Sequence, residues 1–274
     1  MTFAYFEATM DNVLYEYFHD VERNLYVRVG ESTFCQPHFH RSLEILYILD
    51  GEMETTVGDK SFTATANDIV FAHSYYIHSF KPQPAYHKFV LVIPAEYSRE
   101  VDKLLSTSTV SPHLDDKEFN KTLLPILQKL NDEQDTMPTL VKKGYLNVIL
   151  GSLFDHYPTE PIQKNGNIDI MVDVLHYIDN NYSTDIMLDS IADAFGYNKY
   201  YFSRLFNKYI GENLTNYINV VRLQNFITQA KGRTETPLST IAFECGFDSL
   251  TTFHRYFNKV YKTTPKQYLS QYRD

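Results

Sequence analysis

The sequence of 274 residues has little cysteine, no long apolar run and no secretion signal. Its two cysteines, Cys35 and Cys245, lie far apart, which excludes a disulfide framework and favours a reducing compartment. The N-terminus lacks the basic and apolar segments of a signal peptide. The longest apolar stretches, such as residues 89–93, are far shorter than the roughly 20 residues of a membrane helix. These absences predict a cytoplasmic protein with no membrane partner.

Two kinds of catalytic motif are also missing. The sequence has no glycine-rich phosphate loop and no specific Ser/His/Asp arrangement. We therefore expect no catalytic residues, no cofactor and no enzyme activity. The composition is otherwise ordinary, with 43% hydrophobic and 22% charged residues. That balance excludes wholesale disorder, and the length predicts about two domains.

The formal net charge of −9 argues against nucleic acid only as an average over the chain. Residues 168–274 contain 11 basic and 11 acidic residues, so the excess acid lies in the first part of the chain. A neutral module can bind DNA when its basic side chains lie on one face.

Residues 26–93 show the pattern of short β-strands separated by turns. The expected strands include residues 43–49, 52–57, 60–65, 69–72 and 88–93. The dipeptides Asp50-Gly51, Gly58-Asp59 and Asn67-Asp68 are turn signals between them. Near-regular spacing of short strands predicts an all-β sandwich or a small barrel.

After Pro94 the pattern becomes helical, with two apolar stripes at spacings of three and four residues. The stripes consist of Leu123, Leu127 and Leu130, and of Leu146, Ile149 and Leu153. Such stripes pack against their own domain or form a dimer interface. We predict that residues 95–157 form a helical dimerisation segment. Residues 158–167 (PTEPIQKNGN) are rich in polar residues, proline and glycine, which is typical of a linker.

The remainder, residues 168–274, contains an internal repeat. The segments that start at Leu188 and Leu238 match at offsets of 50 and then 51 residues. Each copy is predicted to form a helix, a sharp turn at Gly196 or Gly246, and a second helix. Phenylalanine pairs at spacing i, i+4 anchor each second helix to the core: Phe202 with Phe206, and Phe253 with Phe257.

The opposite face of each second helix carries polar and basic side chains suited to base edges and phosphates. In both copies the second helix has three basic residues and no acidic residue. A helix-turn-helix unit places that helix in the major groove of DNA. The predicted DNA-binding residues are Tyr200, Ser203, Arg204, Asn207, Lys208, Thr251, His254, Arg255 and Lys259.

The same region resembles the AraC/XylS transcription regulators over about residues 170–272. The resemblance lies in Ile191-Ala192, Gly196-Tyr197, residues 202–206, Arg222-Leu223, Ile241-Ala242, Gly246-Phe247, Phe253, Phe257 and Thr264-Pro265 followed by Tyr268. It implies two helix-turn-helix units joined by a long helix, here about Leu214–Ala230, that read successive major-groove segments. Two positions depart from the family pattern. Leu269 stands where arginine is frequent, and Phe226 stands where alanine is usual.

A cluster of potential ligands precedes the helical region. His38, His40 and Glu44 share the parity of one strand face, and His78 follows later. The spacing H-x-H-x3-E-x6-G, completed by Gly51, resembles the cupin barrel over about residues 25–94. The expected glycine before this motif is Ser32 instead. Three roles remain open for the cluster: a divalent metal site, contacts to an effector, or a purely structural part of the barrel.

The sequence therefore predicts an α+β multidomain protein that regulates transcription. Its expected parts are a cupin-like effector-binding β-barrel at 1–94, dimerisation helices at 95–157, a linker at 158–167 and an all-α tandem helix-turn-helix domain at 168–274. The expected effector is a small polar molecule, with a sugar as one candidate, bound by His38, His40, Glu44, His78 and Tyr47, and no metal is assigned. Double-stranded DNA, a second copy of the chain and RNA polymerase are the candidate macromolecular partners. The alternative is a metal-dependent cupin enzyme fused to a DNA-binding domain.

Overall fold

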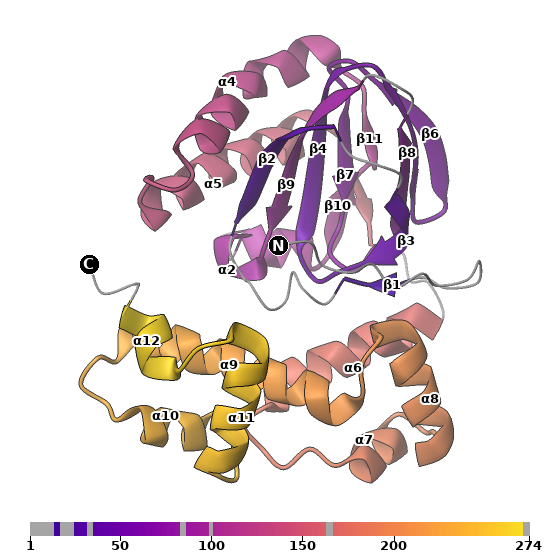
Figure 1. Ribbon diagram of the computed structural model, residues 1–274. Helices are drawn as coiled ribbons and strands as arrows, with labels where there is room; N and C mark the ends of the chain where they lie inside the picture. Colours follow the sequence, from indigo (N-terminus) through magenta and orange to yellow (C-terminus); the bar gives the residue numbers. More distant parts are fainter. Residues whose placement is uncertain are drawn as a thin grey trace. The chain divides into compact units, whose positions relative to one another are not determined.

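A computed structural model describes residues 14–16, 25–31, 35–82, 86–98, 101–162 and 167–270. The chain divides into two compact units, Met1–Asn165 and Gly166–Asp274. The first is rich in β-strands and the second is helical (Figure 1). This arrangement confirms the predicted α+β fold class, and each unit is described below by itself.

The N-terminal unit contains two five-stranded sheets. One has the order β1-β3-β8-β5-β6, formed by Leu14–Tyr15, Cys35–Phe39, His78–Pro82, Glu52–Val57 and Lys60–Thr65. The other has the order β11-β7-β4-β9-β2, formed by His113–Leu114, Ile69–Ala72, Leu43–Asp50, His87–Ile93 and Tyr26–Gly30. The second sheet thus includes a strand beyond the predicted end of the barrel at residue 94.

Strand β4 separates two apolar cores because alternate side chains point to opposite faces of a strand. Leu46 and Ile48 belong to the core inside the barrel, which also contains Phe80 and Tyr86. Ile45 and Tyr47 belong to a larger core on the other face of the sheet. A strand buried on both faces explains the nearly continuous apolar run of residues 43–49.

Two helices supply the other side of the larger core: α4 (Lys117–Glu133) and α5 (Thr139–His156). The Asp116 side chain caps α4 by accepting a hydrogen bond of 3.1 Å from the Phe119 amide. The apolar stripes of the two helices are at most 3% exposed: Leu123, Leu127, Leu130, Leu146, Ile149 and Leu153. They pack within their own unit, so the stripes that motivated the predicted dimer interface do not supply one.

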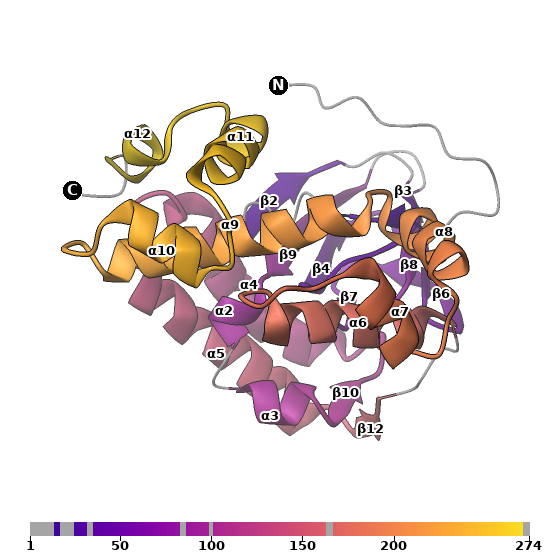
Figure 2. The same cartoon turned by 90° about the horizontal axis from the view of Figure 1, so that it is seen from below.

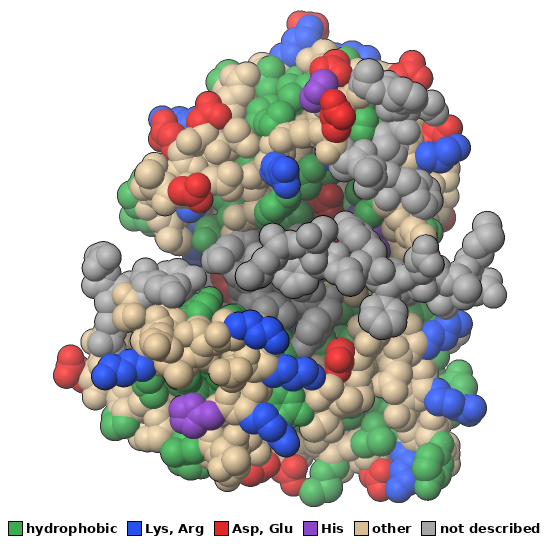
Figure 3. All heavy atoms as spheres, viewed as in Figure 1, with side chains coloured by type: hydrophobic (Ala, Val, Ile, Leu, Met, Phe, Trp, Pro, Cys, Tyr) green, Lys and Arg blue, Asp and Glu red, His purple; other side chains and the backbone are tan. Residues whose placement is uncertain are grey.

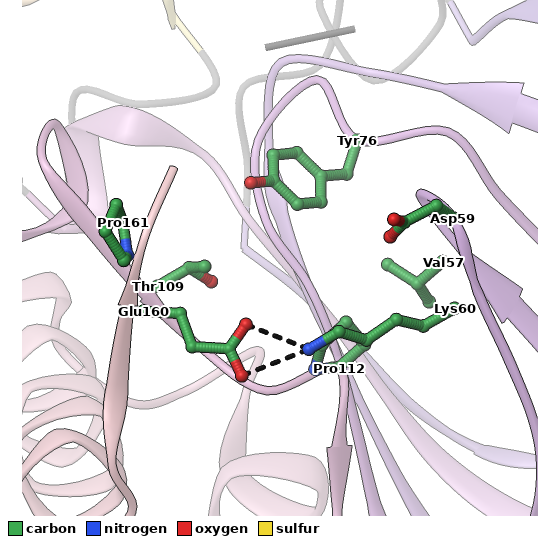
Figure 4. Close-up of a pocket in the computed structure, with 8 residues that line it drawn as sticks. All are labelled: Val57, Asp59, Lys60, Tyr76, Thr109, Pro112, Glu160 and Pro161. Atoms are coloured by element: carbon green, nitrogen blue, oxygen red, sulfur yellow. Dashed lines mark hydrogen bonds and ion pairs between the residues drawn. The ribbon is translucent and has the colours of Figure 1, made fainter. Parts of the chain in front are cut away.

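Shorter elements complete this unit: α2 (Ala95–Ser98), α3 (Asp102–Leu105), β10 (Ser108–Val110) and β12 (Thr159–Pro161). Strand β12 pairs with β10 and lies inside the predicted 158–167 linker. Lys60 Nζ donates to Glu160 at 2.8 Å and ties β12 to the β5–β6 hairpin beside a small pocket (Figure 4). The first residues of the predicted linker therefore belong to the barrel unit.

The C-terminal unit is formed by six described helices around a seventh, α9 (Leu214–Gly232), which contacts most of the others. They are α6 (Asn167–Asn181), α7 (Leu188–Ala194), α8 (Lys199–Ile210), α10 (Leu238–Glu244), α11 (Leu250–Tyr261) and α12 (Pro265–Ser270). Figure 2 shows α7 and α8 towards one end of α9 and α10 to α12 towards the other. No described helix has the length and apolarity needed to cross a membrane.

The sequence repeat corresponds to a repeat of backbone geometry. Gly196 and Gly246 both have positive φ, at +75° and +88°. Each following helix begins at a side-chain cap, Asn198 for α8 and Ser249 for α11. The phenylalanine pairs are at most 1% exposed, as their spacing predicts.

Candidate functional site

Four titratable side chains converge inside the barrel: His38, His40, Glu44 and His78. The strands that carry His38, His78 and Glu44 belong to both sheets. His38 on β3 lies opposite His78 on β8 in the antiparallel register. Glu44 comes from β4 in the other sheet. His38 and Glu44 do not lie on one continuous strand, because a bend at residues 41–42 separates β3 from β4. The convergence therefore depends on the pairing of distant strands and not on parity along one strand, which the sequence pattern predicted.

Each imidazole of this His–Glu cluster is oriented by a backbone carbonyl. The Nδ1 atoms of His38, His40 and His78 lie 2.8, 2.9 and 2.8 Å from the carbonyl oxygens of Gln36, Ser42 and Tyr76. A carbonyl oxygen only accepts hydrogen bonds, so each Nδ1 carries a proton and donates it. In the neutral ring Nε2 is then the atom with a free lone pair.

The Nε2 atoms of His40 and His78 lie 3.0 and 3.1 Å from the same Glu44 oxygen, Oε2. A lone pair and a carboxylate are both acceptors, so a proton or a metal cation must lie between them. Burial favours the neutral form of Glu44, but hydrogen bonds from His40 and His78 outweigh burial and hold its pKa well below the usual value. Burial, with the nearby His78 charge, lowers the pKa of His38.

These residues fit a divalent metal ion. The ligand atoms of His38, His40, Glu44 and His78 all lie within 4.8 Å of one another, and all four side chains are buried. Imidazole nitrogens with one carboxylate suit zinc, iron or manganese. Donation of the second ring nitrogen to a carbonyl is the usual support of a metal-binding histidine.

Tyr47 does not join this cluster, which corrects the expected effector contact. Position 47 has the opposite parity to position 44, so the Tyr47 ring lies in the core that faces α4 and α5. Its hydroxyl donates to Asn67 Oδ1 at 2.9 Å. The physical reason was available in the sequence, because an odd separation along a strand places two side chains on opposite faces.

Two further residues, Cys35 and Glu16, lie beside His38, and no sequence motif marks either of them. Cys35 Sγ lies 3.4 Å from His38 Nδ1, and Glu16 Oε1 lies 3.8 Å from His38 Nε2. Burial raises the pKa of the Cys35 thiol to about 12. Glu16 follows β1, which reaches β3 only through a parallel pairing between separate segments.

The second candidate site is the outer face of α8 and α11. Most of the predicted DNA-binding side chains are exposed: Tyr200, Arg204, Asn207, Lys208, Thr251, His254, Arg255 and Lys259. Ser203 is half-buried. Figure 3 shows Lys and Arg side chains and a histidine on the surface that α11 contributes to.

The basic groups on this face differ in their surroundings. Among the described residues, none forms a hydrogen bond or ion pair with Arg204. Arg255 and Lys259 lie over the Tyr256 ring, at 5.2 and 5.9 Å from its centre. Lys199 differs, because it pairs with Asp189 at 3.2 Å. The charges of Arg204, Arg255 and Lys259 thus remain available to phosphates or base edges.

Comparisons with known proteins agree with this division of the chain. A helix-turn-helix domain family matches residues 191–271, and a cupin domain family matches residues 18–83. The Tn10 TetD protein of Escherichia coli is 37% identical over 99 residues, which are 36% of this chain and 71% of TetD. The regulatory protein SoxS of E. coli K12 is 31% identical over 99 residues, which are 36% of this chain and 92% of SoxS.

More distant similarities extend the comparison. The xylose operon regulatory protein of E. coli K12 is 30% identical over 98 residues, which are 36% of this chain and 25% of that regulator. Among solved structures, ToxT of Vibrio cholerae aligns with 90% of this chain and 98% of its own, at 13% identity and a TM-score of 0.40. The curated relatives match about a third of this chain, so they leave the ligand of the barrel open.

Proposed function

Because the chain belongs to the AraC/XylS family of DNA-binding transcriptional regulators, we propose that α8 and α11 read its operator and that a ligand at the His–Glu cluster controls that binding. The observation that carries the DNA part is the duplicated exposed face, with Arg204 and Arg255 at equivalent positions. A ligand exerts control only when it binds the DNA-competent and DNA-incompetent states with different affinity.

Substitution of the two arginines tests the DNA part. The probe is a duplex selected by the wild-type protein from a random-sequence library. Arg204→Ala and Arg255→Ala should each lose about 1–3 kcal/mol, or roughly 5- to 150-fold in affinity, if they contact bases. Arg28→Ala, at an exposed barrel position, is the matched control. Unchanged gel-shift affinity for both helix variants would refute this assignment.

The ligand of the barrel is the finer part of the proposal. A divalent metal held by His38, His40, Glu44 and His78 would supply a fixed positive charge and open coordination positions for a polar effector. The expectation of a sugar stays a prediction, because the matched part of the xylose regulator is a quarter of that protein.

Metal analysis of the purified protein tests this finer part. Stoichiometric zinc, iron or manganese in the wild type, absent from His40→Ala and Glu44→Gln, supports a metal site. Effector response in a reporter assay should change in the same variants. If both variants fold, hold no less metal than the wild type and respond normally, the cluster is structural.

A metal-dependent enzyme in the barrel is the second candidate function, favoured by the same four-ligand set. The two candidates differ in what ligand addition does. A regulator changes its DNA affinity without consuming the ligand, whereas an enzyme converts the ligand in the absence of DNA. Mass spectrometry of the ligand before and after incubation separates the two.

A homodimer is a further part of the proposal, with a corrected surface. Leu140, Val141 and Val148 on α5 are 82%, 43% and 50% exposed. Gly144 and Gly151 lie on the same side of α5, and a Cβ at either position would meet no atom within 4 Å. Small residues beside exposed apolar ones allow a second copy of α5 to approach closely. RNA polymerase as a partner stays a prediction without assigned residues.

Sedimentation of the full chain tests the dimer. Val148→Asp should shift a dimer towards monomer at micromolar concentration, because it places charge in the centre of the apolar face. The control Lys129→Asp changes charge on the exposed side of α4. A wild-type protein that sediments as a monomer at tens of micromolar would contradict this part.

A further inference from the structure

Lys88 is a buried cation in the interior of the barrel. It lies on β9 between Tyr86 and Val90, which both face the inner core. Its side chain points the same way, because its Nζ lies 4.8 Å from the centre of the Phe80 ring and 5.8 Å from that of Tyr86. The residue is 3% exposed, and the little surface that remains includes its Nζ.

Within the described part of the chain, Lys88 has no counter-charge. Among the described residues, no hydrogen-bond acceptor or carboxylate is paired with its Nζ. The buried carboxylate of the barrel interior, Glu44, is bonded to His40 and His78. Burial of an unpaired charge is among the costliest arrangements in a protein, and two aromatic faces compensate only part of that cost.

Lys88 and the His–Glu cluster share one neighbour. The Phe80 ring lies 5.4 Å from the His78 ring and 6.3 Å from the His38 ring, between centroids. The same ring underlies the Lys88 ammonium. A cation and a set of metal-type ligands therefore lie around one aromatic side chain inside the barrel.

We propose that the barrel binds a small organic acid whose carboxylate pairs with Lys88 while its remaining polar group meets the His–Glu cluster. This inference rests on the proposed regulatory function and names the chemical class of its effector. The hydroxyl groups of a neutral sugar can accept hydrogen bonds from the ammonium but supply no counter-charge. A phosphate is typically held by arginine forks or several backbone amides, whereas a single ammonium between two rings suits one carboxylate with an apolar body.

Thermal unfolding of the full chain tests the proposal with three acids and their amides as probes. The pairs are lactate with lactamide, succinate with succinamide, and phenylacetate with phenylacetamide, and inorganic phosphate is tested alongside. At least one acid should raise the melting temperature while its amide does not, because stabilisation grows with ligand saturation. Lys88→Met should weaken binding of that acid by roughly 30-fold or more. The control Lys81→Met removes an exposed lysine that pairs with Glu54 and should change nothing.

The melting temperature of the ligand-free protein gives a second, independent test. Lys88→Met should melt at or above the wild-type temperature, because the variant removes an unpaired buried charge. Lys88→Gln is the second uncharged variant if the methionine variant does not fold. The proposal is overturned if no acid stabilises the wild type, if amides act as well as acids, or if only phosphate acts. It is also overturned if the uncharged variants keep wild-type affinity. Gel shifts without any acid report separately on whether the DNA-binding function itself holds.

Discussion

The two helix-turn-helix copies have the same turn but different surroundings. A Cβ added to Gly196 would meet no atom within 4 Å. A Cβ added to Gly246 would lie 2.8 Å from the Tyr182 carbonyl oxygen and 2.9 Å from Ser183 Cα. Both glycines meet the demand for positive φ, but only the second also allows the close approach of another segment.

Arg222 on α9 forms hydrogen bonds to the segment that approaches Gly246, residues 182–184. Arg222 Nε and a terminal guanidinium nitrogen donate to the carbonyl oxygens of Tyr182 and Thr184, both at 2.8 Å. Arg222 is 8% exposed, so these bonds satisfy a largely buried cation. The second copy is therefore fixed to the segment that follows α6, residues 182–184, and to α9. Both copies pack against α9, since Phe206 on α8 lies 5.8 Å from Tyr217 between ring centroids. The turn of the second copy, however, is also in close contact with another segment, which the turn of the first copy is not.

The largest expected effect is the contrast between two alanine substitutions. Gly246→Ala should destabilise the C-terminal unit by roughly 2–5 kcal/mol, since it combines positive-φ strain with a clash against backbone. Gly196→Ala has the strain alone and should cost about 1–2 kcal/mol. Urea unfolding of both variants measures the difference. Equal losses would mean that the tight packing around Gly246 does not matter to stability.

The second helices of the two copies, α8 and α11, also differ in their hydrogen bonds to α9. Tyr256 on α11 donates its hydroxyl to Asn216 Oδ1 on α9 at 2.8 Å, whereas the equivalent position of α8 is Leu205. Tyr256→Phe should cost about 0.5–1.5 kcal/mol of stability, because it leaves a partly buried amide oxygen without this donor. Tyr201→Phe on the exposed side of α8 is the matched control.

Loss of the Tyr256 hydroxyl should also change how DNA binding depends on the spacing of the two DNA segments. If Tyr256 fixes α11 against α9, its loss should make binding more tolerant of one inserted base pair between the two DNA segments. Gel shifts with the native and the lengthened duplex measure that tolerance for the wild type and Tyr256→Phe. An unchanged preference for the native spacing would limit Tyr256 to a role in stability.

Local signals explain why much of the fold could be predicted. The strands at 52–57, 60–65 and 69–72 were predicted with the bounds that the structure shows, because turn dipeptides delimit them. The helix-turn-helix copies were predictable because each signal occurs twice, at a constant offset. Phe226, a departure from the family pattern, packs 4.6 Å from Phe253 between ring centroids and fills the core of the second copy.

Long-range pairing explains what could not be predicted. No local pattern states that His38 lies opposite His78, since this contact joins strands far apart in sequence. The contact of Lys88 with Phe80 is also not predictable, because β8 and β9 are consecutive strands that belong to different sheets. An apolar stripe such as that of Leu127 indicates burial but not the partner, and here the partner is the barrel sheet. The interpretation of that stripe as a dimer surface was wrong for this physical reason.

The smallest expected effect concerns the ends of α8 and α11. Both helices end at a residue in the left-handed conformation, Gly211 with φ +74° and Lys262 with φ +55°. A residue with a Cβ is strained there, whereas glycine is not. Lys262→Gly relieves the strain but gains entropy in the unfolded chain, which offsets part of the benefit.

The net result should be a gain of about 0.3–1 kcal/mol for Lys262→Gly. The reverse change, Gly211→Lys, should lose about 1 kcal/mol, since it introduces the same strain at the end of α8. Both are measured by urea unfolding without DNA, so that loss of a basic side chain near α11 does not enter the result. A loss of stability in Lys262→Gly would mean that the lysine side chain stabilises α11 by more than its backbone strain costs, and the two helix ends would then differ in kind.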